Sequence, residues 1–365
     1  MSADRALSLV HFFPSFSYGG QQRRLATLIE ALGPAVTHRI YALDGDVAAA
    51  PLIERYSQAS LAPLALKKSS LVSLTNVRRL AGAIEESGAD LLCTYNFGSI
   101  EAAIANRLGP KLPHVHHEDG FGRDEAQARN KKRAFARRRL LGKARVVVPS
   151  LGLERIAVNE WGVARERLVR IAPGIDIDRF RRPLRVDRAP VVVGSLGSLR
   201  AEKNHLRLIR CFERAAAGRD ARLVICGEGA ERAALEHAIA HSAARDRIKL
   251  SGATETPDAA LAEFDIYAVS SDTEQTPLGM MEAMASGLPV LATNVGDIAA
   301  MLGDAADNNV FAPVDEEGFA ARLATLIDNA AERVALGEKN AARAAGFDQS
   351  AMIEAFRALY FNAAA

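Results

Sequence analysis

The sequence predicts an α/β protein made of two doubly wound parallel-sheet domains. The chain has 365 residues, which is longer than one hydrophobic core usually grows, so two domains are expected. Strand-like runs rich in Val, Ile and Leu alternate with amphipathic stretches of helical length. This alternation is typical of parallel sheets that helices cover on both faces.

The first domain is predicted to span residues 1–172. Its strand-like runs lie at residues 7–13, 37–43, 89–95, 112–117 and 144–150, and helical patterns between them include residues 21–32, 77–87 and 100–108. Short apolar runs mark the strands, and amphipathic patterns of helical length mark the helices.

The second domain is predicted to span residues 190–348. Its strand-like runs lie at residues 190–197, 221–227, 247–252, 264–270 and 288–293, with helical patterns such as 205–217 and 231–241 between them. Pro, Gly and charged residues interrupt both periodicities over residues 173–189, so we interpret this segment as the linker. Residues 349–365 are apolar at helical spacing and are expected to form a closing helix that packs back on the first domain.

Composition excludes several classes of protein. Hydrophobic residues make up 49% and charged residues 25% of the chain, without the long apolar run of a membrane span or the polar bias of disorder. The start lacks the pattern of a signal peptide, so a cytoplasmic location is expected. Cys93, Cys211 and Cys226 lie in apolar runs and predict buried, reduced thiols.

Two glutamates flank a predicted helix start in TEQTPLGMMEAMASGLPV, residues 273–290. Thr276 fits an N-cap and Pro277 a first helical residue, so the positive end of the helix dipole would favour a diphosphate. Glu274 and Glu282 do not suit phosphate, but ionised carboxylates accept hydrogen bonds from sugar hydroxyls. The alternative is that Glu282 is an acid favoured near a helix start and that Glu274 is a solvated loop residue.

Several motifs occur together in an order that resembles a known family. They are SYGGQQRR after the first strand, APGIDIDRF at the hinge, GSLRAEKN, CGEGAER, and the Glu-x7-Glu pair followed by EAMASGLPV. In this order they resemble the retaining glycosyltransferases of the GT4 type. The resemblance implies the GT-B fold, in which two Rossmann-like domains face an interdomain cleft.

The resemblance also implies roles for individual residues. Asp119, Glu274 and Lys203 are expected to be catalytic, with Glu274 near the donor sugar and Lys203 neutralising the departing diphosphate. Glu282 is expected to bind the ribose hydroxyls. Relatives usually carry an arginine five residues before the lysine, but this chain has Ser198 there. The leaving group is therefore short of one cation unless Arg200 or another basic side chain supplies it. The nucleotide-binding set is Gly19, Gly20, Ser198, Lys203, Gly227, Gly252, Gln275, Thr276, Pro277, Leu278, Gly279 and Glu282.

Glycines near strand ends allow a close backbone approach to an anion. Gly19 and Gly20 follow the first strand and open a helix, a position that suits phosphate and also suits a simple structural turn. CGEGAE supplies Gly227 and Gly229 but lacks the third glycine of a dinucleotide fingerprint. We therefore interpret it as a turn that lines the nucleotide site.

The stretch HVHHEDGFGRDE concentrates reactive side chains at a strand end. In a strand, His114 and His116 share one face and His117 the other, so the three imidazoles do not converge on one metal ion. The resemblance places Asp119 where relatives have a histidine facing the anomeric carbon, with His117 and Glu118 as neighbours on the acceptor side. The alternative is that Glu118 and Asp119 cap the next helix or bind the backbone of their own loop.

A basic segment, RNKKRAFARRRLLGKAR, spans residues 129–145. It interleaves charges with apolar residues, as a basic amphipathic helix does, and Arg137, Arg138 and Arg139 are expected on its acceptor or membrane side. A solvated helix face and contact with an anionic membrane or acidic acceptor are both open. Nucleic acid is disfavoured because no recognition module accompanies the charge.

The resemblance therefore implies a retaining glycosyltransferase that moves a sugar from a UDP- or GDP-sugar to a hydroxyl of a lipid or growing surface glycan. Neither a metal ion nor another cofactor is expected to be required, because the helix end and Lys203 would neutralise the leaving diphosphate. The chain would be cytoplasmic, with peripheral attachment to the inner face of the membrane as an option. A sugar-nucleotide epimerase and a catalytically impaired binding protein remain the alternatives.

Overall fold

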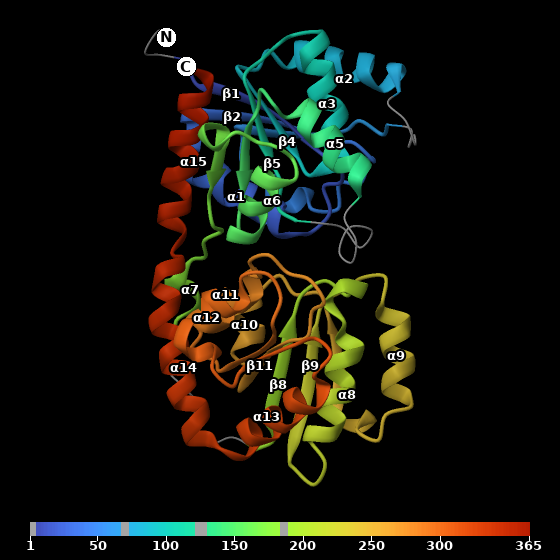
Figure 1. The fold of residues 1–365 in the computed structure, drawn as a ribbon, viewed down its shortest axis with the longest axis vertical. Coiled ribbons are helices and arrows are strands. Elements are labelled where there is room, and N and C mark those ends of the chain that lie inside the picture. The colour runs from blue at the N-terminus through green and yellow to red at the C-terminus, as the bar shows by residue number, and fades with distance from the viewer. Residues whose placement is uncertain (1–4, 67–72, 121–129, 183–188) are drawn as a thin grey trace. The chain divides into compact units, whose positions relative to one another are not determined.

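Two separate parallel sheets organise the chain (Figure 1). The computed structural model describes residues 5–66, 73–120, 130–182 and 189–365. The chain divides into two compact units, one of Met1–Ala172 with Ser350–Ala365 and one of Pro173–Gln349. An α/β architecture built on two doubly wound sheets is confirmed.

The first unit contains a seven-stranded sheet whose strands pair in parallel. Its order is β3 (Ala59–Pro63), β2 (Val36–Ala42), β1 (Leu7–Phe13), β4 (Leu91–Tyr95), β5 (His114–His117), β6 (Arg145–Val148) and β7 (Leu168–Arg170). The strand order reverses between β1 and β4. The helices are α1 (Gly20–Leu32), α2 (Leu74–Ser87), α3 (Ile100–Leu108), α5 (Lys131–Leu140), α6 (Leu151–Asn159) and α15 (Gln349–Ala364).

Alternation along β1 explains how this sheet is covered on both faces. Leu7 and Leu9 enter a core with residues of α1 and α15. Val10 and Phe12, which point to the other face, enter a core with residues of α2 and α3. A strand buried on both faces reads as a continuous apolar run, which is why the sequence predicts β1 at its observed bounds.

The second unit repeats this plan with six parallel strands. Their order is β10 (Ile248–Gly252), β9 (Ala221–Cys226), β8 (Val191–Leu196), β11 (Ile266–Val269), β12 (Val290–Thr293) and β13 (Val310–Phe311), which reverses between β8 and β11. The helices are α7 (Ile177–Phe180), α8 (His205–Ala215), α9 (Arg232–Ala240), α10 (Pro257–Leu261), α11 (Leu278–Ala285), α12 (Ile298–Leu302), α13 (Glu316–Asp328) and α14 (Ala330–Ala344).

The segment predicted as a linker, 173–189, has local structure of its own. Residues 183–188 lie outside the described part of the chain. Asp176 accepts a hydrogen bond from the backbone N–H of Arg179 and so caps α7.

All three cysteines are buried and free, as the sequence predicts.

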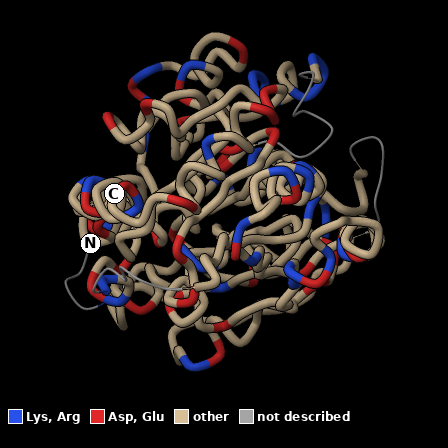
Figure 2. The backbone as a smooth tube through the Cα atoms, turned by 90° about the horizontal axis from the view of Figure 1, so that it is seen from below, with Lys and Arg blue, Asp and Glu red and all other residues tan. Residues whose placement is uncertain are grey.

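Charges of both signs are interspersed along much of the described backbone (Figure 2), in line with a net charge of only +2. Helix α5 differs, because its sequence KKRAFARRRL contains basic residues and no acidic one. Within the described ranges, no helix combines the length and the apolar character needed to cross a bilayer.

Candidate functional site

The predicted donor-site residues of the second unit lie around the carboxyl edge of its sheet, whereas Gly19 and Gly20 lie in the first unit. Lys203 ends a short turn after β8, and Glu274 lies in the loop after β11. These two strands are neighbours at the point where the strand order reverses. Ligands of doubly wound sheets bind at this point, outside the carboxyl ends of the strands.

Lys203 and Glu274 form an ion pair there. The Lys203 ammonium donates to Oε1 of Glu274, and the two side chains are 26% and 10% exposed. The Ser271 hydroxyl donates to the same oxygen over 2.7 Å. Burial, with a smaller effect of the Lys203 charge, lowers the pKa of the neighbouring His205 to about 4. The pair thus places a cation and a carboxylate together in partly desolvated surroundings, where electrostatic effects are stronger than in water.

Two glycines allow the loops around this pair to approach one another. A Cβ at Gly227, after β9, would lie 1.8 Å from the carbonyl oxygen of Gly197, after β8. Gly296 has φ +59°, and a Cβ there would lie 2.1 Å from the carbonyl oxygen of Glu274. Any larger residue would push the loops apart. The packing of the loops at this edge therefore depends on glycine.

Helix α11 begins one residue later than the sequence predicts. Pro277 is the N-cap and Leu278 the first helical residue, so the assignment of Thr276 as N-cap is wrong by one position. Pro277 has an extended conformation (φ −69°, ψ 112°), so it ends the loop rather than starting the helix. The helix end still follows the loop that carries Glu274.

Glu282 lies on α11 and is only 7% exposed. Burial is the largest cause that raises the pKa of the Tyr267 phenol on β11, and the negative charge of Glu282 is the second. The Tyr267 hydroxyl donates to the carbonyl oxygen of Leu196 at the end of β8, over 3.1 Å. A Cβ at Gly279 would lie 2.5 Å from the same hydroxyl. Glu282 and Gly279 therefore lie beside the same strand ends as Lys203.

The remaining predicted residues of this unit have less specific surroundings. Ser198 is half-buried in the turn after β8, and its carbonyl accepts from the N–H of Arg200 over 2.9 Å. The Arg200 guanidinium lies 3.9 Å from Glu202. Gly252 ends β10 with φ +83°. Their expected contacts with a nucleotide stay predictions.

The first unit has a polar cluster at its own strand-order reversal. Asp119, after β5, accepts two hydrogen bonds from Arg24 of α1, at 2.5 and 2.8 Å, and a third from Gln21. Asn96, after β4, accepts from the backbone N–H of Asp119 over 2.9 Å. Burial raises the pKa of Asp119, but the charge and hydrogen bonds of Arg24 outweigh it, so the net pKa is lowered. Gly19 is the N-cap of α1, so this cluster lies beside the predicted glycine turn.

Three residues predicted on the acceptor or membrane side are buried within the first unit: His117, Glu118 and Arg137. His117 is 1% exposed, and its ring stacks on those of Tyr95 and Phe356, with ring centroids 4.5 Å and 5.7 Å apart. Glu118 is 0% exposed and accepts from Nε of Arg137 over 2.8 Å.

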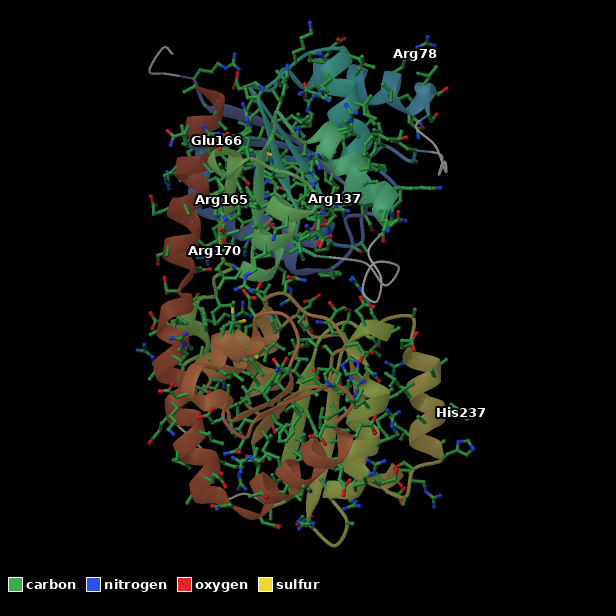
Figure 3. The ribbon with its side chains drawn as sticks, in the orientation of Figure 1. Arg78, Arg137, Arg165, Glu166, Arg170 and His237 are labelled. Carbon is green, nitrogen blue, oxygen red and sulfur yellow. The ribbon has the colours of Figure 1, made fainter. Side chains whose placement is uncertain are left out.

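The prediction that Arg137 lies on an exposed face is wrong (Figure 3). Its guanidinium is 1% exposed and lies 4.9 Å from the Phe97 ring and 4.8 Å from the Trp161 ring. Stacking and a carboxylate partner together offset the cost of burying this charge. Arg138 and Arg139 are exposed, as the sequence predicts, and Arg129 lies outside the described residues.

The histidines behave as the strand pattern predicts. Thr94 Oγ1 lies 2.7 Å from His114 Nε2 and 2.8 Å from His116 Nδ1, which confirms that these two rings share one face. Over the ranges that the structure describes, no group of three or more His, Cys, Asp or Glu side chains is arranged to bind a metal ion.

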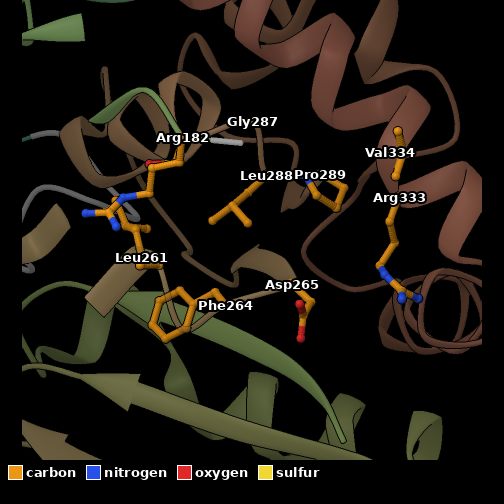
Figure 4. Close-up of a pocket in the computed structure, with 11 residues that line it drawn as sticks. Arg182, Leu261, Phe264, Asp265, Gly287, Leu288, Pro289, Arg333 and Val334 are labelled. Atoms are coloured by element: carbon orange, nitrogen blue, oxygen red, sulfur yellow. The ribbon is translucent and has the colours of Figure 1, made fainter. Parts of the chain in front are cut away.

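A pocket elsewhere in the second unit is separate from this edge (Figure 4). Its lining includes Asp265, just before β11, and Pro289, just before β12, together with Arg182 and Arg333. Residues that precede parallel strands lie at the amino edge of the sheet, opposite Lys203 and Glu274. We therefore do not assign the pocket to the predicted site.

Comparison with known proteins identifies the class of fold. The structure of HepE from Anabaena in complex with UDP-glucose superimposes with a TM-score of 0.80 at 17% identity, covering 98% of this chain and 100% of that one. The chain therefore has the GT-B fold, as predicted.

Two family models match consecutive parts of the sequence. "Glycosyltransferase Family 4" matches residues 18–179, and "Glycosyl transferases group 1" matches residues 176–343. The chain belongs to the GT4-type glycosyltransferases.

Relatives with a described activity align with this chain over only part of their own length. D-inositol 3-phosphate glycosyltransferase of Corynebacterium aurimucosum is 28% identical over 63% of this chain and 60% of its own length. GDP-mannose-dependent alpha-mannosyltransferase of Mycobacterium tuberculosis is 31% identical over 55% of this chain and 53% of its own length. The chain thus spans about half to three fifths of the length of the curated relatives it matches.

Proposed function

We propose that the protein is a retaining glycosyltransferase that transfers a sugar from a nucleoside diphosphate sugar to an acceptor hydroxyl. The observation that carries the proposal is the Lys203–Glu274 pair at the strand-order reversal, in which Glu274 lies in the loop that precedes α11. A cation and a helix N-terminus both favour a diphosphate, and a nearby carboxylate favours sugar hydroxyls. Membership of the GT4 type supports the same reaction.

Each residue has a defined part in the proposed reaction. Glu282 binds the ribose hydroxyls of the donor, and Glu274 positions Lys203 and the sugar. The acceptor oxygen bonds to the anomeric carbon as the bond to the diphosphate oxygen breaks, on the same face. The departing phosphate takes the acceptor proton, while Lys203 stabilises the negative charge that develops on it. Asp119, fixed by Arg24, is the proposed polar group of the acceptor unit.

The donor is proposed to be a UDP- or GDP-sugar. HepE, which shares the fold, was solved with UDP-glucose, and the mycobacterial relative is named as GDP-mannose-dependent. The two names favour different bases, so the proposal covers both. No metal ion enters the proposed mechanism.

Incubation of the protein with UDP- and GDP-sugars, with and without a panel of hydroxyl acceptors, tests this function. We expect release of the nucleoside diphosphate and a new α-linked glycoside only when an acceptor is present. Isomerisation of the donor sugar without acceptor would instead identify an epimerase. Donor binding without turnover on every acceptor would identify a binding protein, the alternative that Ser198 and Asp119 motivate.

We further propose that α5 attaches the protein to an anionic membrane surface that carries the acceptor. Phe135 of α5 is 60% exposed, Leu108 at the end of α3 is 73% exposed, and Arg107 donates to the backbone carbonyl of Arg139 over 2.9 Å. The Arg139 guanidinium lies 5.3 Å from the Phe135 ring centroid. Exposed apolar side chains beside arginines match a surface of anionic headgroups over acyl chains.

Replacing Arg138 and Arg139 by Gln should weaken binding to vesicles that contain anionic lipid. Each basic residue near such a surface contributes about 1 kcal/mol, so the double variant should lose about 2 kcal/mol, or about 30-fold in vesicle affinity. The matched control, Arg165→Gln with Arg170→Gln, removes the same charge elsewhere in the first unit (Figure 3). Equal vesicle binding by both double variants, measured by sedimentation, would rule out the proposed surface.

A further inference from the structure

Asp272 connects the two segments that carry Lys203 and Glu274. It lies two residues before Glu274, and its backbone N–H donates to the carbonyl oxygen of Glu202 over 2.8 Å. Its carboxylate accepts from the Asn204 side chain over 3.0 Å. Asp272 therefore binds the residue before Lys203 and the residue after it.

Arg207 completes this connection from helix α8. It is only 9% exposed, and one terminal nitrogen lies 2.7 Å from Oδ1 of Asp272. The other terminal nitrogen donates to the carbonyl oxygen of Ser270 over 2.8 Å. The Ser270 hydroxyl in turn donates to the carbonyl oxygen of Lys203 over 3.0 Å. A planar guanidinium suits such a two-point contact, which a lysine could not reproduce.

The backbone at Asn204, between Lys203 and Arg207, is also held by these side chains. Asn204 has φ +44°, a left-handed conformation that is uncommon for residues other than glycine. Its side chain accepts from the N–H of Arg207 over 3.1 Å and caps α8 while it donates to Asp272. The turn after Lys203 is thus fixed in an uncommon conformation by the same residues that bind the Glu274 segment.

We propose that Arg207, Asn204 and Asp272 form a clamp that sets the position of the Lys203 ammonium against the Glu274 carboxylate. Arg207 is then a positioning residue for the transfer reaction, although it lies on α8, outside the loops that carry the predicted ligand contacts. The catalytic consequence depends on the function proposed above. The geometric consequence, a change in the surroundings of the Lys203 ammonium, does not.

The clamp is tested first on the protein without any substrate. Reductive ¹³C-methylation labels the lysines, and a Lys203→Arg variant assigns the Lys203 resonance. We expect this resonance to shift toward that of exposed lysines in Arg207→Ala and Asp272→Asn. It should stay unchanged in Arg214→Ala, a control on the same helix whose side chain is 55% exposed and lies 3.7 Å from Glu316. An unmoved Lys203 resonance in folded Asp272→Asn would overturn the proposal.

Transfer kinetics test the consequence for catalysis. A displacement of catalytic groups by about 1 Å can lower the rate about 100-fold, so Arg207→Ala should lower kcat at least tenfold with little change in the KM for the donor. The double variant Arg207→Ala/Asp272→Asn should lose no more than the more impaired single variant, because both act through one contact. Additive losses would contradict the clamp. If wild type itself transfers no sugar, the proposed function fails and the Lys203 resonance alone decides the clamp.

Discussion

Replacing Lys203 by Ala should lower the rate of sugar transfer by about two to three orders of magnitude. Loss of one preorganised group that stabilises developing negative charge typically costs this much in kcat. The donor diphosphate would lose its side-chain cation, and the Glu274 carboxylate, only 10% exposed, would lose its ion-pair partner. Initial rates at saturating donor, with product measured by chromatography, give the effect on kcat.

A matched control separates this effect from a general loss of charge. Lys339 is exposed on α14 of the same unit, and Lys339→Ala should transfer at the wild-type rate. Wild-type kcat in Lys203→Ala would exclude Lys203 from the leaving-group site.

Glu282→Ala should abolish the thermal stabilisation that a saturating nucleoside diphosphate gives to wild type, since only ligand bound to the folded state raises stability.

The free energy of unfolding should fall steeply as the pH drops below about 6.5, because the first unit buries neutral histidines. Burial is the largest cause of the lowered pKa values of His11, His38 and His117, and the pKa of His38 falls to about 4. The unfolded chain then binds protons first, so stability is full above the unfolded pKa of 6.5 and is lost toward the folded values. Each such imidazole costs about 1.4 kcal/mol per pH unit in that window.

Three such groups together would cost about 4 kcal/mol at about pH 5.5, a large fraction of the 5–15 kcal/mol of a typical domain. Urea unfolding between pH 8 and pH 5 measures this slope. His38→Gln should reduce it by about 1.4 kcal/mol per pH unit, whereas His237→Gln, at an exposed position on α9, should leave it unchanged (Figure 3). A flat pH profile in wild type would contradict the buried neutral state of these rings.

The fold was largely predictable where strands are buried on both faces. All ten predicted strands are present, with ends shifted by at most two residues. The sequence misses β3, β7 and β13, which lie at the sheet edges or consist of two residues. Residues of β3 and β7 are partly or fully exposed, so no apolar run marks them. Their pairing depends on neighbouring strands that are distant in the chain.

The candidate site was predictable only in part. The motif spacing predicts Lys203, Glu274 and Glu282, because family resemblance is carried by short segments. Arg207 and Asp272 are not apparent, since they meet only after residues about 65 positions apart in the chain fold together. Asn96 was missed because its contact with Asp119 forms only when β4 and β5 pair. The signal that could have found it is an Asn directly after a predicted buried strand.

Arg137 shows how a charge run can mislead. Seven basic neighbours between residues 131 and 145 favour an exposed face, and sequence alone does not show which arginine turns inward. The Glu118 carboxylate and the Trp161 ring, which select Arg137, come from other elements of the unit. Specific long-range partners therefore decided its position against the local pattern.

A crystal structure of the protein with the nucleoside diphosphate that stabilises it most tests the central claim directly. The account predicts diphosphate oxygens within hydrogen-bond distance of Lys203 Nζ and of the first backbone N–H groups of α11, with the ribose hydroxyls on Glu282. A nucleotide bound away from residues 274–282, or on the first unit, would contradict it.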